Sequence, residues 1–253
     1  GFILKLLNFY APVPHLLKEG LNNPDHLEIF DMCSGSGKYV LQIQKDLEEL
    51  MGKPVPFYLS DKYPSRNAFQ FLKRIGNGKL SYLHEPVNVF HMPENLGGFK
   101  TLFSAAHHFP PEKIKAILRR AVKSNSGIGI FDGGDKGILL IVCVILLFPL
   151  LFLILTPFLK PFKFSWIVFT YFLPVIPLCT IWDGIISVIK LYTPVQLLKI
   201  SQEIEANHYH WMTGKVKNKI GMNITYLMGY PKTLYYSEGT KVRPSELMSL
   251  TNL

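Results

Sequence analysis

Two patterns of apolar residues divide the chain. Up to about residue 136, short apolar runs alternate with stretches in which apolar residues recur every three or four positions. The periodic stretches predict helices and the short runs predict buried strands. Strands are expected over 27–32, 55–60, within 80–89, over 101–106 and over 127–131. Strands that alternate with helices in this way predict an α/β fold with a doubly wound parallel sheet.

The alternation resumes near residue 192. Thr193-Pro-Val-Gln196 matches a capping box with proline at the first helical position, which predicts the start of a helix. Two strand-like runs follow, over 208–216 and 223–230, and their spacing predicts an antiparallel hairpin that closes the sheet.

Residues 137–191 have a different character. Ile138–Leu155 is apolar apart from Pro149, and a second charge-free stretch runs over 164–182. About 20 apolar residues are enough to cross a hydrocarbon core of ~30 Å, and their transfer into lipid is favourable. The sequence therefore predicts a membrane-embedded or membrane-associated helical hairpin inserted after the fifth strand.

The topology of this hairpin stays open. A spanning hairpin would carry Lys160 and Lys163 to the far side, against the positive-inside tendency. Prolines are expected to break the helices at Pro149, Pro157, Pro161, Pro174 and Pro177. A re-entrant or interfacial hairpin remains an alternative, and so does a hairpin buried in an enlarged core.

Charge and cysteine content narrow the classes of partner. The 253 residues carry a formal net charge of +9, with most of the basic excess in the second half, beside the apolar stretch. This distribution suits an anionic membrane surface better than nucleic acid. The three cysteines form neither a disulfide framework nor a zinc motif, and we find no metal-ligand spacing.

A small-residue turn follows the first predicted strand, where doubly wound sheets bind their ligands. It reads Asp31-Met-Cys-Ser-Gly-Ser-Gly37, and Asp61 at the end of the second strand is placed to accept hydrogen bonds from ribose hydroxyls. A phosphate-binding P-loop is excluded because Lys38 is followed by Tyr39. A dinucleotide fingerprint fails at its last glycine, which is Val40 here.

With these residues in place, the chain resembles the class I S-adenosylmethionine-dependent methyltransferases. Asp31, Cys33, Gly35 and Gly37 occupy the positions of the family's first motif, with Cys33 in place of a glycine. Asp61 matches the ribose-binding acid. The resemblance covers roughly residues 25–135 and 192–231, and the apolar insertion resembles a membrane-associated branch.

The resemblance implies a fold and a cofactor. The fold is a Rossmann-like methyltransferase sheet, and the cofactor is S-adenosylmethionine, converted to S-adenosylhomocysteine without a metal. Asn88 takes the place of an acidic residue near the adenine, and its amide oxygen can still accept a hydrogen bond. The residues expected at the cofactor are Asp31, Cys33, Ser34, Gly35, Gly37, Asp61, Lys62, Asn88, Val89 and Ser104.

Three residues are candidates for the chemistry. His107 or His108, after the fourth strand, is a candidate base or substrate ligand, although the pair could instead shape the loop before Pro110. Asp183 could orient a polar head presented from the bilayer, or it could cap a helix or pair with Lys190. Asp132 and Asp135 are expected to be solvated or to shape their glycine-rich turn.

The sequence thus predicts a membrane-associated methyltransferase with its catalytic domain on the cytoplasmic side. Its acceptor is expected to be lipophilic, such as a quinone precursor or a lipid amine, and its partners are the bilayer and that acceptor. Alternatives are a non-catalytic membrane adaptor that keeps the fold and a nicotinamide-dependent reductase. The methylated atom and the oligomeric state stay open. We expect N-terminal capping helices over 1–24, a methyltransferase core over 25–136 and 192–231, the hairpin over 137–191 and a tail over 232–253.

Overall fold

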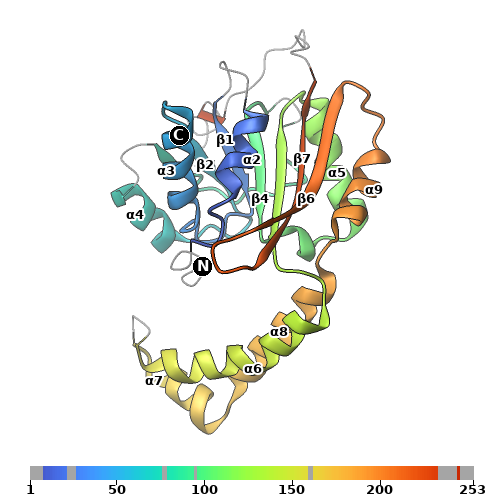
Figure 1. Cartoon of the computed structure of the whole chain (residues 1–253). Coiled ribbons are helices and arrows are strands. Elements are labelled where there is room, and N and C mark those ends of the chain that lie inside the picture. The colour runs from blue at the N-terminus through green and yellow to red at the C-terminus, as the bar shows by residue number, and fades with distance from the viewer. Residues whose placement is uncertain are drawn as a thin grey trace. The chain divides into compact units, whose positions relative to one another are not determined.

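The computed structural model describes residues 8–21, 27–75, 79–93, 96–158, 162–232 and 244–245. The chain divides into two compact units (Figure 1). The core unit comprises Gly1–Gly133 and Pro194–Leu253, and the hairpin unit comprises Gly134–Thr193. Residues 1–7 and 22–24 of the expected N-terminal capping region and most of the C-terminal tail lie outside the described residues.

The core unit contains a seven-stranded sheet in the order β3-β2-β1-β4-β5-β7-β6. β1 to β5 are parallel, and β7 pairs antiparallel with both β5 and β6. The strands are β1 Ile29–Met32, β2 Phe57–Leu59, β3 Leu80–Tyr82, β4 Phe99–Phe103, β5 Ile128–Gly133, β6 Tyr209–Lys217 and β7 Asn223–Pro231. The structure confirms the predicted doubly wound sheet with its closing antiparallel pair.

Helices cover both faces of this sheet (Figure 1). On one face α2 packs against α3, and on the other α5 packs against α9. The helices are α2 Val13–Gly20, α3 Val40–Met51, α4 Arg66–Ile75, α5 Pro111–Lys123 and α9 Pro194–Gln202. Proline begins α5 and α9 because the first helical position needs no amide proton for an intrahelical bond.

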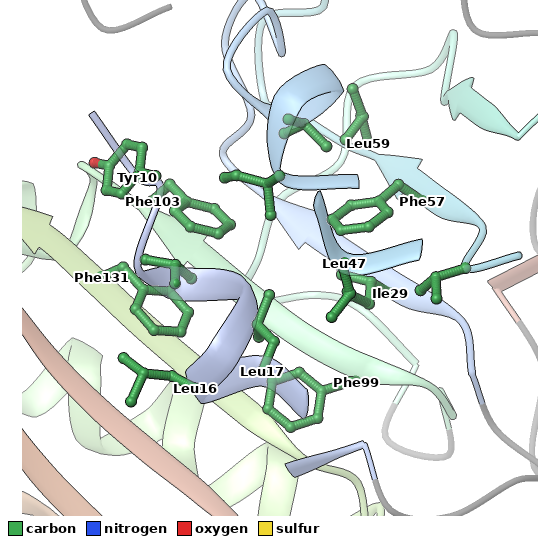
Figure 2. Packing of buried hydrophobic residues seen from close by; sticks show 14 of the residues in the cluster. Tyr10, Leu16, Leu17, Ile29, Leu47, Phe57, Leu59, Phe99, Phe103 and Phe131 are labelled. Carbon is green, nitrogen blue, oxygen red and sulfur yellow. The ribbon is translucent and has the colours of Figure 1, made fainter. Parts of the chain in front are cut away.

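One large apolar cluster lies between the sheet and the helices α2 and α3 (Figure 2). Leu17 of α2 and Leu47 of α3 are fully buried over the strands. The rings of Phe103 on β4 and Phe131 on β5 stack with their centres 5.0 Å apart. This packing fixes the carboxyl ends of β1, β4 and β5, where the candidate site lies.

The fourth strand differs from its predicted bounds. It begins at Phe99, two residues earlier than expected, because the amides of Phe99 and Lys100 bond to the carbonyls of Glu28 and Gly127 in the neighbouring chain segments. It ends at Phe103, because Ser104 adopts a left-handed conformation with φ of 47°. The chain then forms a short 3-10 turn, η2, over Ala106–His108, so the two histidines lie on a turn.

The hairpin unit begins with the long helix α6, Ile138–Leu155, continued by the 3-10 turn η3, Thr156–Phe158. The prediction that Pro149 breaks this helix is wrong. A proline removes one intrahelical hydrogen bond, and here the bonds before and after it keep the helix continuous.

The return arm of the hairpin unit is broken. It consists of α7 Phe164–Ile167, the π-helical turn η4 Val168–Phe172 and α8 Val175–Lys190. The segment Phe164–Phe172 and α8 meet at 74°, and Pro174 lies at the break as predicted. α8 packs on α6, where Val144 fills the space above Gly184.

Within the described residues, α6 with η3 is long and apolar enough to cross a membrane. The bent pair of α7–η4 and α8 passes the same test of length and composition when it is taken as one span.

Candidate functional site

The turn after β1 is held open by three left-handed residues. Cys33, Gly35 and Gly37 have φ of 57°, 55° and 60°. A Cβ at Gly37 would lie 2.5 Å from Leu59 and 3.0 Å from Leu72, so the packing of the turn on β2 and α4 requires glycine. A Cβ at Gly35 would meet nothing within 4 Å. The outer side of the turn at Gly35 is therefore open, as backbone that is closely approached by a ligand must be.

Cys33 stands where the methyltransferases that the sequence resembles carry glycine, and it still adopts the left-handed conformation of the turn. Its backbone is left-handed although it carries a Cβ, an arrangement that costs about 1–2 kcal/mol and is characteristic of functional loops. Burial raises the pKa of its thiol to about 12, with a further contribution from Asp61. Cys33 is therefore a neutral thiol that shapes the turn.

Asp61 ties the second strand to this turn. One of its carboxylate oxygens accepts a hydrogen bond from the amide of Gly35 at 2.7 Å, and the other accepts one from the amide of Tyr63 at 2.8 Å. On the far side, the hydroxyl of Tyr82 at the end of β3 donates to the carbonyl of Gly35 at 2.9 Å. The predicted ribose acid thus lies directly beside the predicted cofactor turn.

Asp31, at the other end of the turn, is fully buried. Its carboxylate accepts hydrogen bonds from Thr101 at 2.8 Å and from the hydroxyl of Tyr39 at 3.1 Å, and its carbonyl accepts one from Ser34. Burial raises the pKa of Asp31 to about 7, because these hydrogen bonds only partly offset the loss of solvation. Asp31 holds β1, β4 and the start of α3 together beneath the turn.

The raised pKa of Asp31 makes a prediction about stability. The native state holds the proton of Asp31 up to about pH 7, whereas the carboxyl ordinarily loses it near 3.8. The protonation of Asp31 therefore contributes to the free energy of unfolding. This contribution is largest at low pH, falls between about pH 4 and pH 7, and stays constant above pH 7. We expect Asp31→Asn to remove that fall, and urea unfolding of both proteins across this pH range measures the difference. An unchanged pH profile would contradict the assignment.

Three predicted cofactor residues lie around Asp61. The amide of Val87 donates to the carbonyl of Asp61, which brings the Asn88 segment next to it. The Asn88 side-chain oxygen accepts the amide of Phe90 at 3.1 Å, and its second lone pair can still accept a hydrogen bond. Val89 is buried, and the Lys62 ammonium lies over the ring of Tyr63.

His107 pairs with a buried acid. Its ring Nδ1 lies 3.3 Å from Asp132 Oδ2, and its backbone amide donates to the same oxygen at 3.1 Å. A carboxylate opposite Nδ1 favours the tautomer that leaves Nε2 able to accept a proton. His108 is exposed, with its ring centre 4.2 Å from that of His107. Of the two candidates, His107 has the geometry of a base.

Of the two expectations for Asp132, that it is solvated and that it shapes its turn, the first is wrong. Its exposed fraction is 2%, because it is the penultimate residue of β5 and lies inside the sheet edge. Its second oxygen, Oδ1, is buried and has no hydrogen-bond partner among the described residues. An unpaired buried carboxylate oxygen is costly, so a water, an ion or a ligand is expected to supply the missing donor.

The N-terminal segment supplies a residue that the sequence did not indicate. Tyr10 is buried, its hydroxyl hydrogen-bonds to the side chain of Ser104, and its ring packs on Tyr39 and Phe103 (Figure 2). Burial, and then Asp132 and Asp31, raise the pKa of Tyr10 above its usual value. Tyr10 therefore connects the surroundings of the cofactor turn with those of the His107–Asp132 pair.

Asp183 belongs to the hairpin unit. It lies in the middle of α8 and is exposed, so the reading of Asp183 as a helix cap is wrong. Within the described part of the chain, no group of three or more histidine, cysteine or acidic residues could hold a metal ion.

Comparisons with known proteins give distant likenesses. No protein-family model matches the sequence, and no curated protein matches it. A SAM-dependent methyltransferase from Aquifex aeolicus is 14% identical, with a TM-score of 0.48 over 89% of this chain and 92% of its own. Human N-acetylserotonin methyltransferase in complex with SAM is 11% identical, with a TM-score of 0.47 over 92% of this chain and 55% of its own.

A putative O-methyltransferase from Nostoc punctiforme is 11% identical, with a TM-score of 0.48, and the chain spans 57% of its length. Likenesses at this distance do not assign a function. The strand order and the left-handed turn, observed in this chain itself, define a doubly wound α/β protein whose sheet is closed by an antiparallel pair.

Proposed function

We propose that the protein is a membrane-associated methyltransferase that uses S-adenosylmethionine and acts on a lipophilic acceptor. The observation that carries this proposal is the contact between Asp61 and the amide of Gly35 at the open side of the left-handed turn. It brings an acid for ribose hydroxyls next to backbone that a nucleoside can approach closely. The distant likeness to methyltransferases is consistent with this proposal, but the proposal does not rest on it.

The residues of the turn fit this donor. Asp61 accepts the ribose hydroxyls, and Asn88 offers a hydrogen-bond acceptor and donor to the adenine edge. Ser34, Gly35 and Gly37 shape the backbone against the donor, and Asp31 fixes the turn from below. When bound there, S-adenosylmethionine supplies a methyl group activated by a sulfonium.

His107 takes up the proton that the acceptor loses. A hydroxyl, a phenol or an ammonium must give up a proton when its heteroatom gains the methyl group, and Nε2 of His107 receives it. Asp132 holds Nδ1 of the ring and stabilises the imidazolium that forms. Tyr10 and the aromatic rings around it exclude water, so the rate gain comes mainly from alignment and a dry site.

The acceptor is lipophilic because the hairpin unit is part of the same chain. Its exposed apolar residues favour contact with lipid, and a substrate held in the bilayer then reaches the enzyme without entering water. We place the core unit on the cytoplasmic side, and Asp183 is our candidate for orienting the polar head of the acceptor.

The test is a calorimetric titration of the detergent-solubilised full chain with S-adenosylmethionine, S-adenosylhomocysteine and NADPH. We expect both sulfur nucleosides to bind at one site per chain and NADPH not to bind. A second readout uses S-adenosylmethionine with a tritiated methyl group and an extract of total membrane lipids. Label is expected to enter the organic phase, and His107→Gln is expected to slow its transfer while it leaves nucleoside binding intact.

Two outcomes would contradict the proposal. A well-folded protein that binds none of the three compounds would be the non-catalytic adaptor, and one that binds only NADPH would be the reductase. If the nucleosides bind but the label stays in the aqueous phase, the proposal of a lipophilic acceptor is wrong, and the proposal of the donor site is unaffected.

A further inference from the structure

The two ends of the hairpin unit both carry cations. At one end, Lys136 precedes α6 and Lys190 ends α8, and both side chains are exposed. These positions share an end because Val144 of α6 packs with Val188 and Leu191. At the other end, Lys163 precedes α7, and its ammonium lies 5.8 Å from the ring centre of Trp166.

The body between these ends has an apolar surface. Nine large apolar residues of α6 are exposed, and at 3.6 residues per turn they cover more than half of its circumference. They are Ile138, Leu139, Val142, Ile145, Leu146, Leu147, Leu150, Leu153 and Ile154. A helix that lies flat in a membrane interface needs a polar face toward water, and α6 has none.

The end near Lys163 is a folded cap rich in aromatic residues. The hydroxyls of Thr156 and Thr170 are buried and lie 3.5 Å apart, and the Tyr171 hydroxyl donates to the carbonyl of Leu153. These contacts fix η4 on the end of α6, so that backbone and side-chain polar groups are paired inside the unit, as hydrocarbon requires. Trp166 of α7 and the exposed Tyr171 of η4 belong to the two residue types that gather at membrane–water interfaces.

The length of α6 matches a bilayer. α6 with η3 has 21 residues, which span about 31 Å as a helix, and the hydrocarbon core is ~30 Å thick. α8 has 16 residues and spans about 24 Å, and the segment α7–η4 turns away from it by 74°. α8 is therefore about 6 Å shorter than the core, a mismatch that local thinning of the bilayer accommodates at modest cost, and the bend lets α7–η4 lie along the interface.

We propose that the hairpin unit crosses the bilayer completely and carries Lys163 and Trp166 to the interface opposite the core unit. The proposal rests on the membrane association in the proposed function and decides among the topologies that the sequence left open. The partner it commits to is the hydrocarbon of a full bilayer.

Two costs oppose the crossing and are outweighed. Asp183 lies seven residues before Lys190, about 10 Å below the near interface, where a carboxylate costs about 2.5–3.5 kcal/mol. Lys160 and Lys163 on the far side act against the positive-inside tendency, but more basic residues flank the hairpin on the near side, among them Lys123, Lys136, Lys190 and Lys199. Each Leu, Ile, Val or Phe near the bilayer centre contributes about −0.3 to −0.6 kcal/mol, and α6 alone consists almost entirely of these residues.

The experiment compares two single-cysteine variants of the full chain in bacterial membranes. The native thiols are removed by the substitutions Cys33→Gly, Cys143→Ala and Cys179→Ala. A single new cysteine is then introduced, in one variant by Lys163→Cys and in the other by Glu49→Cys. Glu49 is an exposed residue of the core unit and is the matched control. Sealed right-side-out and inside-out vesicles are treated with a membrane-impermeant maleimide. We expect the two variants to be labelled in opposite vesicle preparations, with at least a tenfold difference for each.

Each other outcome overturns a defined statement. Labelling of both variants in the same preparation means that the turn returns to the side of the core unit, and the crossing is wrong although membrane association holds. Recovery of the protein in the soluble fraction after gentle lysis means that the membrane part of the proposed function fails, and the crossing fails with it. Carbonate extraction, performed on the same membranes, distinguishes an integral from a peripheral protein.

Discussion

Asp61→Ala is expected to weaken the binding of S-adenosylmethionine by about 30-fold or more. A hydrogen bond from a hydroxyl to a carboxylate contributes about 1.5–3 kcal/mol, and ~1.4 kcal/mol corresponds to a factor of ten. The substitution also frees the Gly35 amide, which Asp61 holds at 2.7 Å, so the turn loses part of its preorganisation. Calorimetric titration with S-adenosylhomocysteine, which lacks the reactive methyl group, measures the change without turnover.

Two control variants make this result specific. Asp61→Asn keeps one oxygen acceptor and is expected to give an intermediate affinity. Glu49→Ala removes an exposed carboxylate that pairs with Lys45 at 3.9 Å, and it is expected to leave the affinity unchanged. If Asp61→Ala binds the nucleoside as tightly as the parent protein, the ribose does not lie at Asp61.

Gly37→Ala is expected to lower the free energy of unfolding by about 2–5 kcal/mol. A left-handed backbone costs a residue with a Cβ about 1–2 kcal/mol, and overpacking a buried site costs about 1–3 kcal/mol. Both costs apply, because φ is 60° and the new methyl group would lie 2.5 Å from the buried Leu59 side chain. Urea unfolding followed by tryptophan fluorescence measures the loss.

Gly35→Ala is the matched comparison, because it has nearly the same φ and no atom near the added methyl group. We expect it to lose only about 1–2 kcal/mol of stability. It is nevertheless expected to bind S-adenosylmethionine poorly, because the methyl group projects into the open space beside the turn. Equal losses of stability in the two variants would show that the contact with Leu59 does not matter.

The pattern of the sequence was sufficient for the order of strands and helices, because each element carries its own periodicity. It was insufficient for the end of β4, which depends on Ser104 in a left-handed conformation that no neighbouring residue type indicates. It also overestimated the effect of Pro149, because helix continuity depends on the surrounding turns as well as on the proline.

Some features of the candidate site could also be predicted from the sequence, and others could not. The positions of the small-residue turn and of Asp61, at the ends of β1 and β2, could be predicted because small residues and an acid follow two successive apolar runs. Asp132 could not, because glycines on its carboxyl side suggested an exposed loop, although its place at the end of a buried strand was a usable signal. The role of Tyr10 could not be predicted, because its partner Ser104 lies 94 residues away in the sequence and only the folded sheet brings the two residues together.

The order of the strands also has a consequence for biosynthesis. β7 pairs with β5 along Ile128–Gly133, yet it leaves the ribosome only after the whole segment 134–193 and α9. Until then β5 is an open edge that presents Ile128, Ile130 and Phe131, the kind of edge on which chains aggregate. A nascent chain that stalls within this apolar segment is therefore a natural client for chaperones and proteases, and the hairpin unit is synthesised before the sheet can be completed.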